Sequence, residues 1–562
     1  MKKSQQLIYF SLVTAVIVVI NILASYLFTR IDLTEDKRFT LSTNTRVVLS
    51  ELNDVVFFKV YLEGDLPPDF RQLQNEIKDK LNEMRIYAKG NLEYEFIDPG
   101  ALESDKQKES LAKQLIGKGI FPTTIQTKES DGSSQKSLFP GAVITYNNNE
   151  QSLNFIQEQI GVSDEQLLNT SIRTLEYNIV NKLRAMTQKR PHQICFLQGQ
   201  GEWTSGYMGD ITNELNNSYI TEYKAIDGKL NALNNYRVVV IAKPDSAFDE
   251  KDKFILDQFI MKGGRVLWLY DYAYANMDSL TRADESIAIP LDLNLNDMPY
   301  RYGARVNVNM IADLQSVPIP IVMGNTGNKP QMAMRPWIYF PMIFPVSTHP
   351  LVNNLNAVKF EFCSSVDTIA VKGIRKTILL ATSPYSREYN LPSRFSLEMI
   401  RKQPDRTLFN EGTKSLGVLL EGSFSSLFKN RIPPTIANDT AIGFKEEGVP
   451  TKMIVIGDGD IIKNGINKST GKIFPCGYDR YNNRMFGNKS LILNMIDYLA
   501  DDSNLIELRN KEIKLRLLNR EVVKANASII KIVNVVAPII FLLLIGIIKW
   551  WWRRRLYAST TN

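Results

Sequence analysis

An apolar run near the C-terminal end constrains this chain most. Residues 532–555 read IVNVVAPIIFLLLIGIIKWWWRRR. A helix of about 20 such residues crosses the hydrocarbon core of a bilayer, and Pro538 is tolerated inside a membrane helix. Tryptophans suit the membrane interface, and arginines after them mark the cytoplasmic side. The sequence predicts a transmembrane helix over residues 529–549, followed by the interface residues Trp550, Trp551, Trp552, Arg553, Arg554 and Arg555.

A second apolar run lies near the beginning of the chain, from Leu7 to Phe28. The alternative is a cleaved signal peptide, whose apolar region has about 7–15 residues and ends at small residues. This run is longer, and the sequence Ala-Ser-Tyr at 24–26 is a poor cleavage site, so we favour an uncleaved anchor. Lys2 and Lys3 place the N-terminus inside. We therefore expect a two-pass membrane protein, with both termini cytoplasmic and a large extracytoplasmic region.

The composition excludes several classes of function. A chain of 562 residues is expected to hold more than one domain. Its net charge is +7, but no basic run with interleaved aromatic residues occurs between the apolar runs, so nucleic acid is not an expected partner. Two histidines are few for a metal enzyme or a histidine-based catalyst. The three cysteines are widely spaced and odd in number, which favours buried thiols over a disulfide framework.

The region after the first anchor alternates predicted strands and helices. Ser42 is positioned to cap a helix over Thr43–Leu52, and strands are predicted over Val55–Leu62 and Leu92–Ile97. Further helices, a hairpin and a long helix follow over residues 70–87, 103–117, 139–155 and 164–184. This alternation predicts a small α/β domain of thioredoxin-like kind, without the CxxC that redox chemistry would need.

A second domain is predicted to begin near Pro191. Buried strands at 194–198, 237–242 and 266–270 are separated by helices, which predicts a parallel, doubly wound sheet of Rossmann-like or amidotransferase-like kind. Later strands are expected at 377–381, 416–420 and 453–456, with an irregular proline-rich insertion over 317–350 and a terminal helix over 488–500. The predicted division of the chain is a tail at 1–6, an anchor at 7–28, an N-terminal α/β domain at 29–190, a doubly wound domain at 191–503, a charged stalk at 504–528, an anchor at 529–549 and a tail at 550–562.

Two short motifs follow predicted strands, where a doubly wound sheet binds ligands. The turn Gly199-Gln200-Gly201-Glu202 lacks the third glycine of GxGxxG, so a tight turn before a helix is favoured over a cofactor loop. Asp458 and Asp460 in the sequence GDGD offer two carboxylates for a hard cation, although a capped turn is the commoner role of such residues. Gln200, Glu202, Asp458 and Asp460 are thus candidate ligand-binding residues, with no metal, no cofactor and no catalytic residue expected.

The last predicted span carries polar and small residues that a simple anchor does not need. Asn534 can bridge helices, Pro538 frees a carbonyl that a neighbouring helix can satisfy, and Gly546 permits close approach of another backbone. These three residues are predicted to dock the span against another membrane protein. Snorkelling of polar side chains to the headgroups is the alternative for Asn534 and its neighbour Lys531.

Several segments of the chain together carry a resemblance to a known family. They are Asp32–Ser42, Leu62–Phe70, Tyr94–Pro99, Phe196–Glu202, Leu419–Phe428, Ile456–Asn464 and Gly487–Leu499. In these segments the chain is similar to the GldG family of gliding-motility proteins, which are auxiliary membrane components of a bacterial ABC transporter. The resemblance covers nearly the whole chain, including both apolar runs, and implies that they lie in the bacterial inner membrane with the region between them in the periplasm.

The resemblance implies partners and a process. The partners would be a cytoplasmic ATPase and a multi-span permease, of the GldA and GldF type, and the process would be gliding motility with its associated secretion, of the type 9 class. Many relatives carry Gly-His-Gly-Glu where this chain has Gly199–Glu202, and Gln200 cannot serve as a general base. No P-loop occurs, so this chain is not itself the ATPase.

The expected function is therefore a non-catalytic, membrane-anchored periplasmic subunit of an ABC-type complex, which binds partner proteins or a substrate that the sequence does not identify. The alternative is an amidotransferase-like or metal-dependent hydrolase that acts on a cell-envelope component through Glu202, Asp458 and Asp460.

Overall fold

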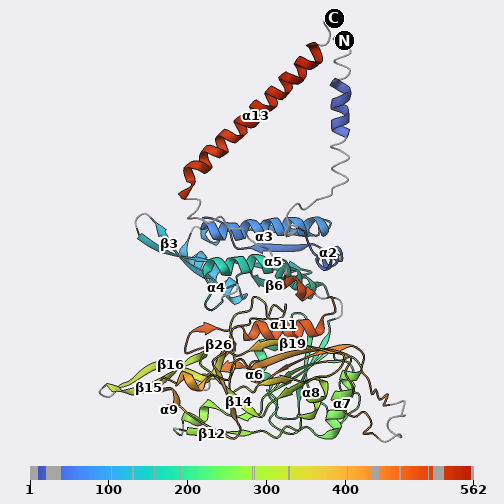
Figure 1. Ribbon diagram of the computed structural model, residues 1–562, viewed down its shortest axis with the longest axis vertical. Helices are drawn as coiled ribbons and strands as arrows, with labels where there is room; N and C mark the ends of the chain where they lie inside the picture. The colour runs from blue at the N-terminus through green and yellow to red at the C-terminus, as the bar shows by residue number, and fades with distance from the viewer. Residues whose placement is uncertain are drawn as a thin grey trace. The chain divides into compact units, whose positions relative to one another are not determined.

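The computed structural model describes residues 10–19, 40–102, 104–129, 132–156, 159–188, 191–281, 283, 285–326, 329–401, 403–432, 442–467, 470–503, 505–510 and 525–558 (Figure 1). The chain divides into two compact units, residues 1–511 and 512–562, and each is described by itself. The predicted tail at 1–6, and residues 7–9 and 20–28 of the predicted first anchor, lie outside the described residues. Residues 10–19 of that anchor form a short apolar helix.

The N-terminal region is a four-stranded mixed sheet with helices, which confirms the expected α/β class. The strand order is β2-β1-β5-β6; β1 and β2 are parallel, and the other neighbours are antiparallel. Ser42 caps α2 as expected, because its hydroxyl accepts the backbone N–H of Thr45. Whether the region is thioredoxin-like stays a prediction. Its elements are α2 (Thr43–Ser50), β1 (Val56–Val60), α3 (Pro68–Tyr87), β2 (Leu92–Phe96), η1 (Pro99–Ala101), α4 (Asp105–Gly117), β3 (Thr123–Glu129), β4 (Gly132–Leu138), β5 (Gly141–Tyr146), β6 (Asn149–Asn154) and α5 (Asp164–Thr187).

Two hairpins in this region differ in how clearly the sequence predicts them. The turn between β5 and β6 has Asn147 and Asn148 at positive φ, the conformation that asparagine tolerates in tight hairpin turns, and this hairpin is confirmed. The hairpin of β3 and β4 was not predicted from the sequence. Its strands read TTIQTKE and GSSQKSL, which lack the apolar alternation that identifies a half-buried strand.

The C-terminal region is built on a seven-stranded sheet of order β19-β22-β23-β10-β9-β7-β8. Five of its strands are parallel, and across the sheet they stand in the order β8-β7-β9-β10-β23. Numbered 1 to 5 by their position along the chain, these strands have the order 2-1-3-4-5, which is one of the two common doubly wound orders. Every residue of β9 and β10 is buried, as expected of strands covered on both faces. The elements of this sheet and its helices are β7 (Gln193–Gln198), α6 (Ser205–Leu215), β8 (Ile220–Ala225), β9 (Val238–Ala242), α7 (Glu250–Met261), β10 (Arg265–Leu269), β19 (Ile374–Ala381), β22 (Ser415–Gly422), β23 (Thr451–Ile456) and α11 (Asn488–Ala500).

Alternate residues of these strands enter two separate cores. Phe196 and Val240 pack in one core with residues of α6 and α11, whereas Leu197 and Ile241 pack in the other with residues of α7. Helices therefore cover both faces of the sheet, as the doubly wound prediction requires. The predicted helix at 488–500 coincides with α11. The relation to amidotransferases stays a prediction.

The strands predicted at 377–381 and 416–420 are confirmed within β19 and β22. They extend the sheet as antiparallel strands, because β22 is antiparallel to β23 and β19 is antiparallel to β22.

The prediction of an irregular insertion over 317–350 is wrong for most of its length. Residues up to 343 form the hairpin β15 (Ser316–Thr326) and β16 (Lys329–Ile343), and the last two residues of β16 pair with β17 (Val358–Lys359). Proline normally argues against a strand, but it is admitted on an edge, where the missing N–H would face away from the ladder.

Shorter elements complete the C-terminal region. Most lie between β10 and β23, and several form two-stranded sheets. They are β11 (Ala273–Tyr274), η2 (Met277–Thr281), β12 (Glu285–Pro290), α8 (Asp297–Tyr302), β13 (Ala304–Val306), β14 (Asn309–Asp313), β18 (Val366–Thr368), β20 (Ser386–Asn390), β21 (Ser393–Ser396), α9 (Glu398–Arg401), η3 (Arg406–Leu408), β24 (Asn464–Ile466), β25 (Ile473–Cys476), β26 (Tyr478–Asp479) and β27 (Arg484–Met485).

The segment predicted as a charged stalk begins with a buried 3-10 helix. Residues 505–510 form the 3-10 helix η4, in which Leu505, Ile506 and Arg509 are buried against the folded region, so the stalk does not begin at 504. Residues 511–524 lie outside the described part of the chain. The second compact unit contains α13 (Ala527–Ala558), in which Ala527–Arg555 is apolar and long enough to cross a membrane. This helix includes the predicted span 529–549 and the interface residues after it.

Candidate functional site

The carboxyl ends of four parallel strands bring the candidate residues together. The turn Gly199–Glu202 follows β7, Lys243 follows β9, Asp271 follows β10 by one residue, and Asp458 and Asp460 follow β23. In open α/β sheets, ligands bind outside this edge, at the point where the strand order reverses. The order reverses here between β7 and β9, so the Gly199–Glu202 turn lies beside the expected crevice.

The Gly199–Glu202 turn is braced by its own glutamate. The carboxylate of Glu202 accepts the backbone N–H of Gln200 at 2.8 Å, and only 4% of Glu202 is exposed. Gly201 has φ +78°, and a Cβ there would lie 1.7 Å from Oδ1 of Asp245, so only glycine fits. Burial raises the pKa of Glu202 above its ordinary value, and the side-chain amide of Gln200 donates to Asp252 at 3.1 Å. These contacts favour the structural interpretation of the turn.

Trp203 ties this turn to the neighbouring strands. Its backbone N–H donates to the carbonyl of Ala242 at the end of β9. Its indole N–H donates to the carbonyl of Gly459 at 3.1 Å. The turn thus holds the ends of β7, β9 and β23 in register with one another.

A lysine lies among the carboxylates at the ends of β10 and β23. Nζ of Lys243 is 2.8 and 2.7 Å from the two carboxylate oxygens of Asp271, and 3.0 Å from Oδ2 of Asp460. Burial would lower the pKa of Lys243, but Asp271 and Asp460 raise it above its usual range, so the ammonium form is stabilised. Gly459 allows this approach, because a Cβ there would lie 2.6 Å from Cα of Lys243.

Asp458 has both carboxylate oxygens committed to the backbone. Oδ1 accepts the N–H of Asp460 at 2.6 Å, and Oδ2 accepts the N–H of Glu361 at 2.7 Å. Its side chain is fully buried, and burial, with Asp460 nearby, raises the pKa of Asp458 well above its ordinary value. The first of these bonds is the capped turn that the sequence favoured, and the second joins the end of β23 to the segment that carries Glu361.

The ionic network continues outward in alternating charges. Lys463 is 2.7 Å from Asp460 and 2.9 Å from Glu361, and Lys359 is 2.9 Å from the other oxygen of Glu361. Burial alone would raise the pKa of Glu361, but the ammonium groups of Lys359 and Lys463 lower it well below its usual range. Asp460 and Glu361 are each shared by two lysines, so positive and negative charges alternate along the network and compensate one another.

The three aspartates do not fit a resident metal ion. Asp271, Asp458 and Asp460 offer oxygens within 4.8 Å of one another, which is close enough for shared coordination. However, Lys243 already supplies the positive charge to two of them, and the backbone N–H groups use both oxygens of the third. Calcium takes six to eight oxygen ligands, and magnesium needs near-octahedral geometry. The arrangement therefore supports an internal ion network at the position where a metal enzyme would hold its cation.

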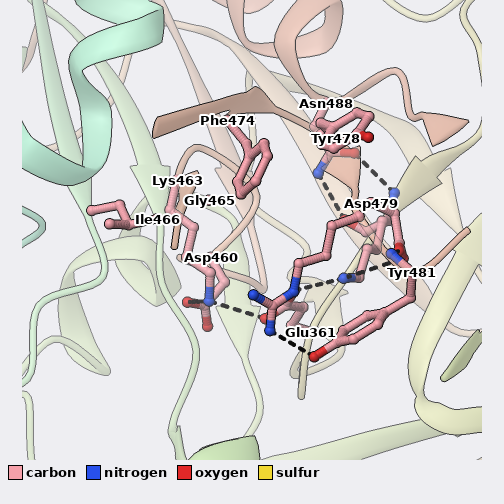
Figure 2. A pocket seen from close by; sticks show the side chains of 13 residues that line it. Glu361, Asp460, Lys463, Gly465, Ile466, Phe474, Tyr478, Asp479, Tyr481 and Asn488 are labelled. Atoms are coloured by element: carbon pink, nitrogen blue, oxygen red, sulfur yellow. Dashed lines mark hydrogen bonds and ion pairs between the residues drawn. The ribbon is translucent and has the colours of Figure 1, made fainter. Parts of the chain in front are cut away.

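A cleft of about 190 Å³ opens beside this network (Figure 2). Asp460, Lys463 and Glu361 form its polar wall, as Figure 2 shows. Phe474 and Tyr478 form an aromatic wall, with their rings stacked at 5.4 Å. The cleft therefore combines a charge-balanced wall with an aromatic wall.

The sequence located only part of this site. It identified Asp458, Asp460 and the turn that carries Gln200 and Glu202, and the structure places all four at the carboxyl edge of the sheet. It missed Lys243, Asp271, Glu361 and Lys463. The first two had a signal, since a polar residue at or just after the end of a buried strand projects from this edge.

The cysteines take no part in the site. Cys195, Cys363 and Cys476 are free and buried, as expected from their number and spacing. Burial raises the pKa of Cys195 to about 12, so its thiol is not a nucleophile at neutral pH.

Comparison with known proteins identifies a family for the C-terminal region. A family model described as an ABC-type uncharacterized transport system matches residues 191–495, and a model of a domain of unknown function matches residues 35–145. An uncharacterized protein of Borreliella burgdorferi is 22% identical over 536 residues, which cover 93% of each chain. The solved mmIFT52 N-terminal domain aligns over 55% of this chain and 98% of its own, with 12% identity and a TM-score of 0.31.

The first family model covers 305 of the 562 residues, counted from 191 to 495, which is more than half of the chain. That stretch contains the whole doubly wound sheet and the ion network at its carboxyl edge. The chain belongs to the family of auxiliary components of this ABC-type transport system.

Proposed function

We propose that the protein is a non-catalytic, membrane-anchored subunit of its ABC-type complex. The observation that carries this proposal is the ion network at the carboxyl edge of the sheet. Lys243 bridges Asp271 and Asp460, and Lys463 bridges Asp460 and Glu361. A catalytic carboxylate needs a free oxygen facing substrate or metal. The oxygens of these carboxylates instead pair with Lys243 and Lys463, so the edge stabilises the fold and supports a binding surface.

The finer features of the proposal rest on the sequence. The apolar runs at both ends support a two-pass topology with cytoplasmic termini and a periplasmic body. The absence of a P-loop supports a separate ATPase, and the resemblance supports GldA-type and GldF-type partners with a role in gliding motility and secretion. Asn534, Pro538 and Gly546 lie within α13 and are proposed to dock it against the permease.

The decisive experiment is purification of the intact protein from its native membrane, with identification of what accompanies it. An ATPase and a permease should co-purify, and Glu202→Ala should retain them, because Glu202 braces a turn and does no chemistry.

Replacing residues 529–548 by leucines should lower the yield of the permease if the span docks. Purified complex that hydrolyses a cell-envelope component, with the activity lost in Asp460→Asn, would overturn the non-catalytic assignment.

A further inference from the structure

Four cationic residues are buried in the described part of the chain, and one of them lacks a counterion. They are Lys80, Lys253, Arg265 and Arg509, and each is at most 9% exposed. A carboxylate forms an ion pair with each of the first three. Arg509 of η4 is 6% exposed, and no described carboxylate forms an ion pair with it. Because a buried charge without a partner is costly, Arg509 differs from the other three in a way that needs a physical reason.

The guanidinium of Arg509 contacts neutral groups instead. Its Nη1 donates to Oδ1 of Asn494 at 3.0 Å, and its Nη2 donates to the carbonyl of Asn353 at 2.9 Å. Its central carbon lies 5.5 Å from the centre of the Tyr177 ring. No described protein group accepts from the buried Nε. Arginine stays protonated in proteins, so a positive charge is buried here together with an N–H group that has no acceptor.

The acid that acts most on Arg509 is engaged elsewhere. Burial lowers the pKa of Arg509, and Tyr177 and Asp497 offset this only in part. Oδ1 of Asp497 accepts the hydroxyl of Tyr219 at 2.7 Å, and Oδ2 accepts the side-chain amide of Asn181 at 3.2 Å. Asp497 therefore does not supply the contact partner that Arg509 lacks.

A small polar cavity of about 10 Å³ borders Arg509. The polar side chains that line it with Arg509 are Gln159, Thr170, Ser171, Thr174 and Asn178, and none of the other described lining residues is charged. The amides of Gln159 and Asn178 each donate one N–H, to the carbonyl of Asn354 at 2.9 Å and to the hydroxyl of Thr174 at 3.3 Å. Each side-chain amide has a second N–H, so the lining holds further donors besides Nε of Arg509.

The size and charge of this cavity indicate its ligand. A cavity of this volume admits one water molecule or one monatomic ion. Water would accept from Nε but would leave the charge of the guanidinium uncompensated, whereas an anion would accept and compensate together. Carboxylate and phosphate groups have several heavy atoms and exceed the space. We propose that the cavity binds a chloride ion, with Arg509 as its counterion and the amides of Gln159 and Asn178 as further donors.

Bound chloride would join three segments of the folded region. Asn178 lies in α5, Gln159 lies before α5 and is bonded to Asn354, and Arg509 lies in η4. In the sequence, η4 is the last described element before α13. Chloride would therefore fasten the end of the folded region to α5 and stabilise the folded state by mass action. Binding of the ion requires no partner protein, so it stands apart from the proposed function.

Thermal unfolding of the intact protein in detergent tests this site. The unfolding temperature is measured in potassium chloride and in potassium gluconate of equal concentration, so that ionic strength is constant and gluconate is too large to enter. Chloride should raise the unfolding temperature of the wild type by at least about 2 °C. Equal unfolding temperatures in the two salts would overturn the proposal.

Asn178→Asp gives the matched variant, because it places a carboxylate in the cavity lining with almost no change of shape. This carboxylate should compensate Arg509 and repel chloride, so the variant should lose the difference between the two salts. Asn169→Asp makes the same change on α5 at a residue outside the cavity lining and should keep the difference. A salt difference that persists in full in Asn178→Asp would show that chloride acts elsewhere.

Bromide provides a measurement that does not depend on any variant. Crystals of the intact protein grown in bromide should show anomalous scattering in the cavity beside Nε of Arg509. Density there without an anomalous signal would identify a water molecule, and the chloride site would then be wrong.

Discussion

At the scale of single residues, the ammonium group of Lys243 determines what the acidic cluster can do. It contacts two aspartates from different strand ends, and only 16% of its side chain is exposed. Its attraction to them is therefore little screened by water. Without it, two carboxylates would face each other in a poorly hydrated space.

Lys243→Met should accordingly destabilise the protein by about 3–5 kcal/mol, which is the usual cost of removing one partner from a buried ion pair. The measurement is the free energy of unfolding in urea. Lys372→Met, at an exposed lysine, is the control and should change stability by about 0.5 kcal/mol or less. An unchanged stability of Lys243→Met would show that the network is not internally compensated in the way described.

The half-buried Lys452 should make the free energy of unfolding depend on pH. Burial, with Arg265 nearby, lowers the pKa of Lys452 to about 8 from 10.5. The unfolded chain therefore binds more protons than the folded chain between these two values, and folding becomes more favourable as pH rises through this window. Lys452→Met keeps the apolar stem against Tyr498, over whose ring the ammonium lies at 3.9 Å, but it does not titrate.

The expected result is that the free energy of unfolding of the wild type, minus that of Lys452→Met, increases between about pH 7 and pH 9.5. Urea unfolding of both proteins at the two pH values measures this difference, and other titrating groups cancel because both proteins contain them. A difference that stays constant would contradict the lowered pKa.

At the scale of elements, Pro318 and Pro320 protect the outer edge of β15 in the hairpin β15–β16. Pro318→Val with Pro320→Val would restore two outward N–H groups on an exposed strand with high β propensity. The double variant should therefore self-associate, and light scattering during size-exclusion chromatography measures this. Pro345→Val lies in the loop after β16 and should leave the protein's size distribution unchanged. A double variant with the same distribution as the wild type would show that the edges need no protection.

The local sequence pattern of each element explains whether the sequence could predict it. The apolar residues of helices such as α5 and α11 recur at helical spacing, and the buried strands β9 and β10 each contain a short run of apolar residues, so the sequence predicts all four elements. The hairpins β3–β4 and β15–β16 were missed, since the first is polar and the second is rich in proline. Both depend on pairing with a partner strand, which a local pattern does not reveal.

At the scale of the whole folded region, contacts between distant segments determine the site. Asp460 meets Lys243, which is 217 positions away in the chain, and Lys463 meets Glu361, 102 positions away. Sequence patterns gave the strand ends but could not give these pairings, so the prediction found two of the acids and none of the lysines. The N-terminal region is joined in the same way, since Asn181 of α5 donates to Asp497 of α11 at 3.2 Å.

The neighbouring parallel strands β10 and β23 are separated by the chain between Leu269 and Thr451, a difference of 182 positions. Synthesis proceeds at about 5–20 residues per second, so β10 waits roughly 10–40 s for its partner. Throughout this interval the nascent chain presents the unpaired edge of a strand whose five residues are all buried in the folded protein. Pairings of such long sequence separation also form slowly. A holding factor that shields this edge until β23 emerges would therefore raise the yield of folded protein, even though the finished fold has no use for it.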